Sequence, residues 1–192
     1  IPAACQMVLA FQNILTRNKH PLDTGVISVT KIHAGEATNV VPDDCVVEGT
    51  VRTFTNEVLE LIERRMKTIA DATCAAFEAQ CEFEFRRQYP ATVNHVAETD
   101  FARRVLGEVV GAQNVLDFRP TMGAEDFSYF LQAIPGCYFL IGNGDGSHRE
   151  GGHGEGPCML HNPSYDFNDE LIPLGATAWV RLAEAWLAQP RR

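Results

Sequence analysis

The chain has 192 residues, of which 45% are hydrophobic and 21% charged, and it carries a formal net charge of −9. This composition is typical of a globular protein with enough apolar residues for one large core or two modest ones. Acidic and basic residues are interleaved, which argues against nucleic acid as the main partner, because neutralising phosphates requires clustered Lys and Arg. No apolar run approaches the roughly 20 residues that cross a bilayer, so we expect no membrane partner.

The cysteines are scattered and form no C-x-x-C pair; they are Cys5, Cys45, Cys74, Cys81, Cys137 and Cys158. Single cysteines of this kind are mostly buried, reduced residues, and the cytoplasm follows as the default location. The first residue is not Met, and the chain opens directly into a helical pattern. We therefore expect it to be part of a longer protein.

The first half of the chain has alternating helical and strand patterns. Residues 2–19 form an amphipathic pattern in which Val8, Leu9, Phe11, Gln12 and Leu15 lie near one face. Strands are expected over 25–33 and about 45–54, and a helix over 56–79 with the outward pairs Glu60–Arg64 and Glu63–Lys67. Cys81, Phe83 and Phe85 then alternate with charged residues, which predicts a strand with one buried face.

The order α-β-β-α-β is that of a ferredoxin-like β-α-β-β-α-β domain without its first strand. We expect this lid-sized domain to span 1–93, with the missing strand upstream. The pattern resets after 92–95, and 94–192 is the second domain. There we expect helices over 99–111, from near Ala124 and over 171–188, a short strand over 136–141, and a glycine-rich loop over 142–157. The fold class is α+β.

One candidate ligand is His161, in a Pro-containing loop before the last helix. Asp166 and Asp169 are near enough in sequence to orient its imidazole. A single loop histidine is, however, more often structural or simply exposed.

A second candidate is the segment Gly123-Ala-Glu125. Its plain interpretation is a helix start, since acidic residues favour a first turn and glycine permits the preceding turn. The functional interpretation uses the same dipole, because backbone N–H groups at a helix N-terminus suit a substrate carboxylate or carbonyl oxygen.

A third candidate combines Asn39 and Arg52. Asn39 is explained equally well as a turn residue, and Arg52 as a solvated charge on the strand face opposite Val51. A planar guanidinium is nevertheless the usual partner of a substrate carboxylate.

Four motifs stand in one order: His33-Ala-Gly…Asn39-Val…Pro42, Gly49-Thr-Val-Arg52, Gly123-Ala-Glu-Asp-Phe127 and His161-Asn-Pro…Tyr-Asp-Phe-Asn-Asp169. Together they resemble the amidohydrolase branch of peptidase family M20, which includes hippurate hydrolases and N-acyl-amino-acid deacetylases. The resemblance runs over essentially the whole chain.

The resemblance implies a catalytic α/β domain with an inserted lid that mediates homodimers. It implies that His161 is the last metal ligand, that Asn39 and Arg52 meet the substrate, and that Gly123 and Glu125 line the pocket. Serving the partner subunit's site is an alternative role for Asn39. The expected reaction is hydrolysis of a small N-acyl amino acid at a site with two divalent ions (Zn, Mn, Co or Ni). The metals would polarise the carbonyl and activate water, while a Glu takes the proton.

The other metal ligands of the family and its Glu-Glu pair do not occur in this sequence. A zinc site needs three or four protein ligands, so we expect the isolated chain to be inactive. His148 and His153 are expected to be exposed loop residues. Two rivals remain: a non-catalytic dimerisation or regulatory module, and a Cys–His hydrolase using Cys158 or Cys137.

Overall fold

The computed structural model describes residues 1–149 and 159–190. The backbone divides into two compact units. Unit 1 comprises Ile1–Ala91 with Pro120–Ser128, and unit 2 comprises Thr92–Arg119 with Tyr129–Arg192. The division after residue 91 lies close to the boundary expected from sequence at 93, but the short return of 120–128 to unit 1 was not expected.

Unit 1 contains a β-hairpin, formed by strands β1 (Gly25–His33) and β2 (Val46–Thr53). The strands are antiparallel, with Ile27 opposite Val51 and Lys31 opposite Glu48. The register shifts between Val29 and Lys31, which marks a β-bulge. Both strands agree with the alternating patterns of the sequence.

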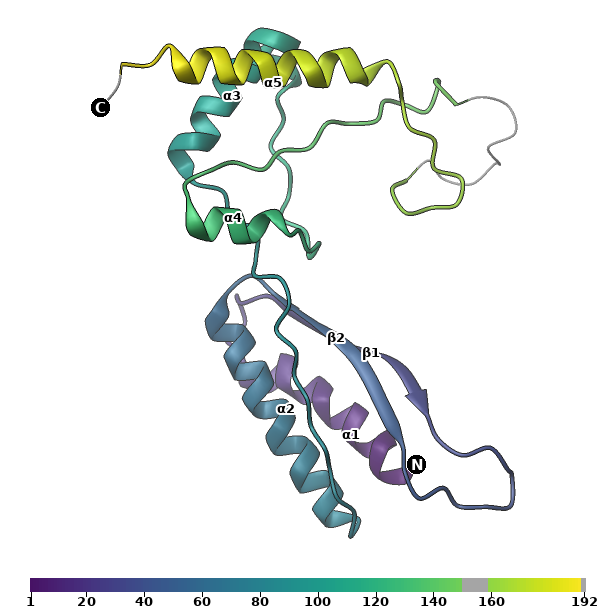
Figure 1. Cartoon of the computed structure of the whole chain (residues 1–192). Helices are drawn as coiled ribbons and strands as arrows, with labels where there is room; N and C mark the ends of the chain where they lie inside the picture. Colours follow the sequence, from purple (N-terminus) through teal and green to yellow (C-terminus); the bar gives the residue numbers. More distant parts are fainter. Residues whose placement is uncertain (150–158, 191–192) are drawn as a thin grey trace. The chain divides into compact units, whose positions relative to one another are not determined.

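Two helices accompany the hairpin (Figure 1). Helix α1 (Pro2–Asn13) continues into a π-helical turn, Ile14–Asn18. Helix α2 spans Asn56–Ala76, and the hydroxyl of Thr55 accepts a hydrogen bond from the Val58 N–H, which caps its first turn. Within the described ranges, no helix is long and apolar enough to cross a membrane.

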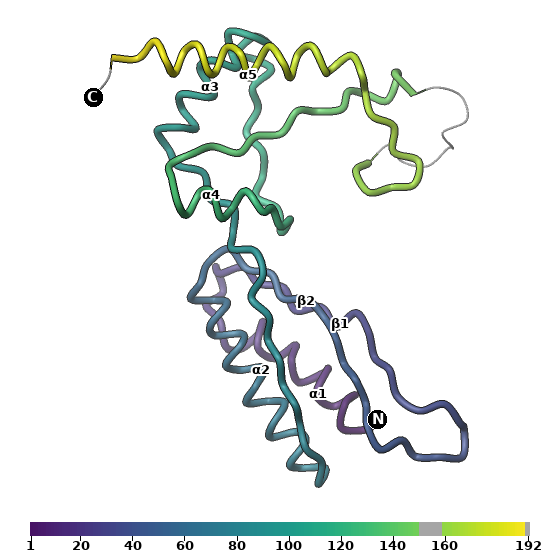
Figure 2. Tube along the Cα trace, in the orientation of Figure 1, coloured from purple at the N-terminus to yellow at the C-terminus, as the bar shows by residue number. Residues whose placement is uncertain are grey.

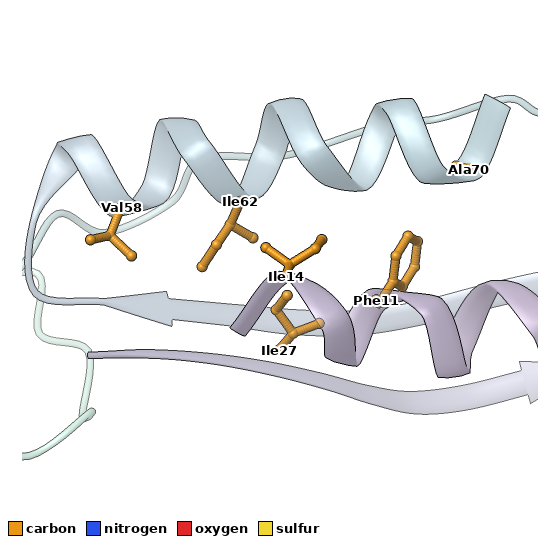
Figure 3. Packing of buried hydrophobic residues seen from close by; sticks show 6 residues of the cluster. All are labelled: Phe11, Ile14, Ile27, Val58, Ile62 and Ala70. Carbon is orange, nitrogen blue, oxygen red and sulfur yellow. The ribbon is translucent and has the colours of Figure 1, made fainter. Parts of the chain in front are cut away.

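The core of unit 1 lies between the two helices and the hairpin (Figure 3). Its buried residues are Phe11, Ile14, Ile27, Val58, Ile62 and Ala70. The sequence-based face of the first helix was partly wrong, because Leu9 is 68% exposed whereas Ala4 is buried. Several apolar stripes are possible on a helix that is apolar on much of its surface, and only the packing partner selects one.

The strand expected over residues 81–85 does not form. Cys81 and Phe83 do pack against the core, so the buried face was correct. The trace runs back beside α2 (Figure 2), but the described residues contain a sheet of only two strands, β1 and β2. A strand needs a hydrogen-bonded neighbour, and in a ferredoxin-like sheet the neighbour of this last strand is the first strand.

The ion pairs of α2 also differ from expectation. Lys67 pairs with Asp71, at 2.9 Å, rather than with Glu63. Glu63 instead accepts two hydrogen bonds from the Arg87 guanidinium, at 2.9 and 2.5 Å. Arg87 lies in the returning segment, so a residue 24 positions away displaced the local i,i+4 partner.

Unit 2 is built on helices α3 (Val96–Val110) and α5 (Leu171–Leu187), with a 3-10 turn at Ala112–Asn114 and part of α4 (Phe127–Ala133). Phe101 of α3 meets Trp186 of α5 edge to face, with ring centroids 5.3 Å apart. Arg181 of α5 also approaches Glu108 of α3, at 3.6 Å. These contacts confirm the two helices expected at about 99–111 and 171–188.

Residues 136–141 were expected to form a strand, and the structure shows an extended segment without a ladder. One backbone bond joins the His95 N–H to the Gly136 carbonyl, at 3.0 Å. The Asn94 side chain then takes the place of a backbone partner, because it bonds both the N–H and the carbonyl of Tyr138, each at 2.8 Å. Because the Asn94 side chain replaces the next backbone partner, the backbone pairing ends after one residue. In a strand, the backbone pairing would continue.

Candidate functional site

Arg52 lies near the end of β2, on the face of the hairpin opposite the buried Val51 side. Its side chain is exposed, and its guanidinium donates a hydrogen bond to the Met122 carbonyl. This bond joins two candidate segments 70 residues apart, both within unit 1. A guanidinium has five N–H donors, so Arg52 retains donors for a second, anionic partner.

The segment from Gly123 to Glu125 precedes α4 rather than opening it, because the helix begins at Phe127. The expected helix start near Ala124 was therefore three residues early. Ser128, which is fully buried, closes the turn: its hydroxyl and its backbone N–H both bond the Glu125 carbonyl, at 2.6 and 3.2 Å. A Cβ built on Gly123 would meet only the Thr121 hydroxyl, at 3.6 Å, so the backbone there is open.

Asn39 is exposed in the loop between β1 and β2. The turn at Ala37–Val40 is closed by a backbone bond of 3.5 Å, and Gly35 takes a φ of +70° beside Pro42. The positive φ explains why glycine occupies this position. Among the described residues, no hydrogen bond joins Asn39 to Arg52 or to Gly123.

His161 is exposed in unit 2 and has a φ of +68°, an uncommon conformation for a residue with a side chain. The turn around it is held by the Asn162 N–H bonding the Met159 carbonyl, at 3.0 Å, and by the Asn162 side chain accepting from the Ser164 N–H, at 2.8 Å. The imidazole makes no hydrogen bond within the described residues. Among the described residues, no hydrogen bond joins the imidazole to Asp166 or Asp169, and their orienting role stays a prediction.

The Asp166 backbone takes part in a polar cluster that the sequence did not predict. Its carbonyl accepts from the Asn143 side chain, at 2.8 Å, and lies 2.9 Å from the His148 ring. The Asn143 side chain also accepts from the Asn168 N–H, at 3.0 Å. His148 was expected to be exposed, but it is half-buried because it closes this cluster. His153 lies outside the described residues.

Exposed carboxylates in both units have lowered pKa values; in unit 2, hydrogen bonds from Ser147 lower the pKa of Asp145. A hydrogen bond from Lys31, helped by its charge, lowers the pKa of Glu48, and a hydrogen bond from Arg86 lowers the pKa of Glu84. A hollow of about 400 Å³ lies between α2 and the returning segment, lined by Glu60, Glu63, Arg64, Lys67, Phe83, Phe85 and Arg87. None of the candidate residues lines it, so it is not the expected substrate pocket.

A metal ion needs several donors at one point, and the described part of the chain has no group of three or more His, Cys, Asp or Glu side chains so placed. The Cys137 thiol accepts a hydrogen bond from Asn94, at 3.6 Å, and contacts the Tyr138 carbonyl; neither contact involves a histidine. This arrangement does not support a Cys137–His nucleophile. Cys158 lies outside the described residues.

Comparison with known proteins decides the family. The sequence model of peptidase family M20/M25/M40 matches residues 13–185. The chain belongs to this family. The resemblance seen in the four motifs is thereby confirmed, and with it membership of a family of metal-dependent peptidases and amidohydrolases.

The chain corresponds to only part of the length of individual M20 family members. It is 31% identical to hippurate hydrolase of Campylobacter jejuni, over 97% of the chain and 46% of that protein. It is 35% identical to N-acetyl-L-cysteine deacetylase of Bacillus subtilis, over 90% of the chain and 38% of that protein. The crystal structure of the Bacillus subtilis YXEP protein, described as a dinuclear metal-binding peptidase from the M20 family, superposes with a TM-score of 0.73 at 25% identity. That superposition covers 99% of this chain and 46% of YXEP, so the chain spans less than half of these relatives.

Proposed function

We propose that the complete protein is a metal-dependent amidohydrolase that cleaves the amide bond of small N-acyl amino acids such as hippurate. The observation that carries the proposal is the hydrogen bond between Arg52 and the Met122 carbonyl. It brings a guanidinium to the Gly123–Glu125 turn, so two segments of the family pattern meet within one unit. The names of the hippurate hydrolase and the N-acetyl-L-cysteine deacetylase support this substrate class.

Arg52 is assigned to the substrate carboxylate, because its remaining N–H donors suit a planar anion. Gly123 and Glu125 are assigned to the wall of the pocket beside it, where the missing Cβ of Gly123 leaves room. Asn39, which lies in an exposed loop, is assigned to the substrate's carbonyl end, in its own site or in that of the partner subunit. These roles rest on the family pattern and on the position of Arg52.

His161 is assigned as one metal ligand, and two divalent ions per complete site, of Zn, Mn, Co or Ni, are the expected cofactors. Its exposed imidazole is compatible with that role. The described residues by themselves do not make a metal site, because a single imidazole cannot hold an ion that requires three or four protein ligands.

Residues 1–93 are assigned to a lid that mediates a homodimer, and residues 94–192 to the closing part of the catalytic domain. The packing of Phe83 against the core, without a neighbouring strand, supports a ferredoxin-like lid completed by one further strand. The cytoplasm is the proposed location. Light scattering of the purified chain tests the dimer, and a monomer at all concentrations would contradict it.

Chimeric enzymes test the proposed activity. The portion of Campylobacter jejuni hippurate hydrolase that matches this chain is replaced by residues 1–192, and hippurate and N-acetyl amino acids are assayed with Mn²⁺ or Zn²⁺. We expect turnover by the chimera, loss of turnover in its His161→Ala form, and no turnover by the chain alone. A folded, metal-loaded chimera without activity would favour the non-catalytic module instead.

The same chimera tests Arg52. Arg52→Ala should raise KM about 10- to 100-fold, because a hydrogen bond to a charged group is worth about 1.5–3 kcal/mol. Arg52→Lys should recover only part of this loss, since an ammonium cannot form the bidentate pair. Equal KM values for all three proteins would remove Arg52 from the binding site.

A further inference from the structure

Two cysteines of unit 1 come together where α2 ends. Cys74 lies in the last turn of α2 and is 7% exposed. The helix stops through backbone bonds from the N–H groups of Phe77 and Ala79 to the Cys74 carbonyl, at 3.0 and 2.9 Å. Glu78 takes a φ of +55° in this turn, which reverses the chain (Figure 2).

After this reversal the chain runs back along α2, and Cys81 lies beside that helix. Cys81 packs against the core cluster, which includes Ala70 of the same helix face. The Cys81 thiol shares a side-chain hydrogen bond with Cys74. The charges of Asp71 and Lys67, which lie one and two turns before Cys74 on α2, also affect the pKa of the Cys81 thiol. Residues 67, 71 and 74 follow the spacing of one helix face, so all three place Cys81 beside that face.

We propose that Cys74 and Cys81 are a modification site, and that they form a reversible intramolecular disulfide on exchange with a low-molecular-weight disulfide such as glutathione disulfide. The described cysteines, this pair among them, form no disulfide in the structure. The bond would tie the end of α2 to the returning segment. No activity of the protein is required for this inference.

The exchange starts at Cys81, which is the more exposed of the two thiols. Its thiolate attacks one sulfur of glutathione disulfide, which forms a mixed disulfide and releases one glutathione thiolate. The Cys74 thiolate then attacks the Cys81 sulfur and releases the second glutathione. The two protein thiols are oxidised, the glutathione disulfide is reduced, and the two thiol protons pass to the two glutathiones.

Burial, followed by the effect of the Cys74 thiol, raises the pKa of Cys81. The attacking thiolate is therefore scarce near neutral pH, and the pair should oxidise slowly. The thiolate fraction of Cys81 limits the first exchange step.

Peptide mapping of the whole chain tests the proposal. The chain is incubated with glutathione disulfide at about pH 8.5, where ordinary thiols are partly ionised, blocked with iodoacetamide, and digested with a protease that cleaves after Glu. Cleavage after Glu78 separates the peptides Arg64–Glu78 and Ala79–Glu82. We expect a species in which these two peptides are joined, with the mass of two hydrogens lost, and its disappearance on reduction with dithiothreitol.

Matched variants identify the pair. Cys5→Ser removes an exposed cysteine and should leave the joined peptide unchanged. Cys74→Ser should abolish it and leave Cys81 as the glutathione adduct, because the second exchange step has lost its thiol. The proposal is overturned if the wild-type chain stops at the glutathione adduct, if Cys81 stays unmodified, or if either cysteine is joined mainly to a different one.

Discussion

Buried aliphatic side chains carry the stability of unit 1. Ile62 is fully buried between α2 and the hairpin, where Phe11, Ile14 and Ile27 also pack. Its removal from water on folding contributes about 1.5–3 kcal/mol, and the close packing around it leaves little freedom to relax into a cavity. Leu9 of α1 has a similar side chain but is 68% exposed.

This contrast gives a matched pair of substitutions. Ile62→Ala should lower the free energy of unfolding by about 2–5 kcal/mol, because it loses buried apolar surface and leaves a cavity. Leu9→Ala should change it by less than about 0.5 kcal/mol. Urea denaturation followed by far-UV circular dichroism measures both, and equal effects would show that the face of α1 has been wrongly assigned.

The β-hairpin depends on one glycine for the close approach of its strands. A Cβ built on Gly49 would lie 2.3 Å from the Ser28 carbonyl oxygen on β1, a distance that no real Cβ contact shows. Because the obstructing atom belongs to the backbone, the strands themselves would have to separate. The pattern of β2 predicted a strand, but nothing in it predicted this approach.

Gly49→Ala should therefore destabilise the hairpin by about 1–3 kcal/mol, the usual cost of overpacking. Gly142→Ala is the control, because a Cβ there would meet nothing within 4 Å. Thermal unfolding of both variants provides the comparison. An unchanged melting temperature for Gly49→Ala would mean that β1 and β2 are not paired in this register.

The hairpin also carries an ion pair with a definite pH dependence. Lys31 and Glu48 face each other across the strands, 2.5 Å apart, and this contact lowers the pKa of Glu48. A carboxyl whose folded pKa is lowered contributes stability above its unfolded pKa, about 4.3 for Glu, and loses it as the pH falls through the folded pKa.

Lys31→Met should consequently lower the urea midpoint at pH 7, and the difference from wild type should shrink to nothing as the medium is acidified below about pH 4. Glu36→Gln, in the loop after β1, removes a carboxylate that has no ion pair among the described residues and should show no such pH dependence. A Lys31→Met difference that persists in acid would have to come from packing rather than charge.

At the scale of the whole molecule, unit 2 exposes many large apolar side chains. They include Tyr129, Phe130, Ile134, Leu140, Trp179 and Val180. Exposed apolar residues in such numbers usually mark a contact surface. The chain spans 46% of the YXEP structure that it superposes on, so the rest of the complete protein is the expected cover.

The chain alone should therefore bind a hydrophobic dye such as anilinonaphthalene sulfonate strongly. The hippurate hydrolase chimera should bind it several-fold less, because burial removes the apolar protein surface to which the dye binds. Trp179→Ser in the chain alone should reduce the signal, whereas the exposed Leu9→Ser in unit 1 should change it little. Equal dye binding by the chain and a folded chimera would show that these residues stay exposed in the complete protein.

The amino-acid order by itself determined the helices, both strands of the hairpin and the family, because periodicity, turn residues and short motifs are local properties. The roles of Asn39, Arg52, Gly123, Glu125 and His161 came from the same motifs and stay predictions. Tertiary structure decided which stripe of α1 is buried, that Glu63 pairs with Arg87, that residues 81–85 lack a strand partner, and that His148 joins the Asp166 carbonyl. Each of these depends on groups that are distant in the chain, or on a neighbouring strand, and local patterns do not specify which of several possible partners is reached.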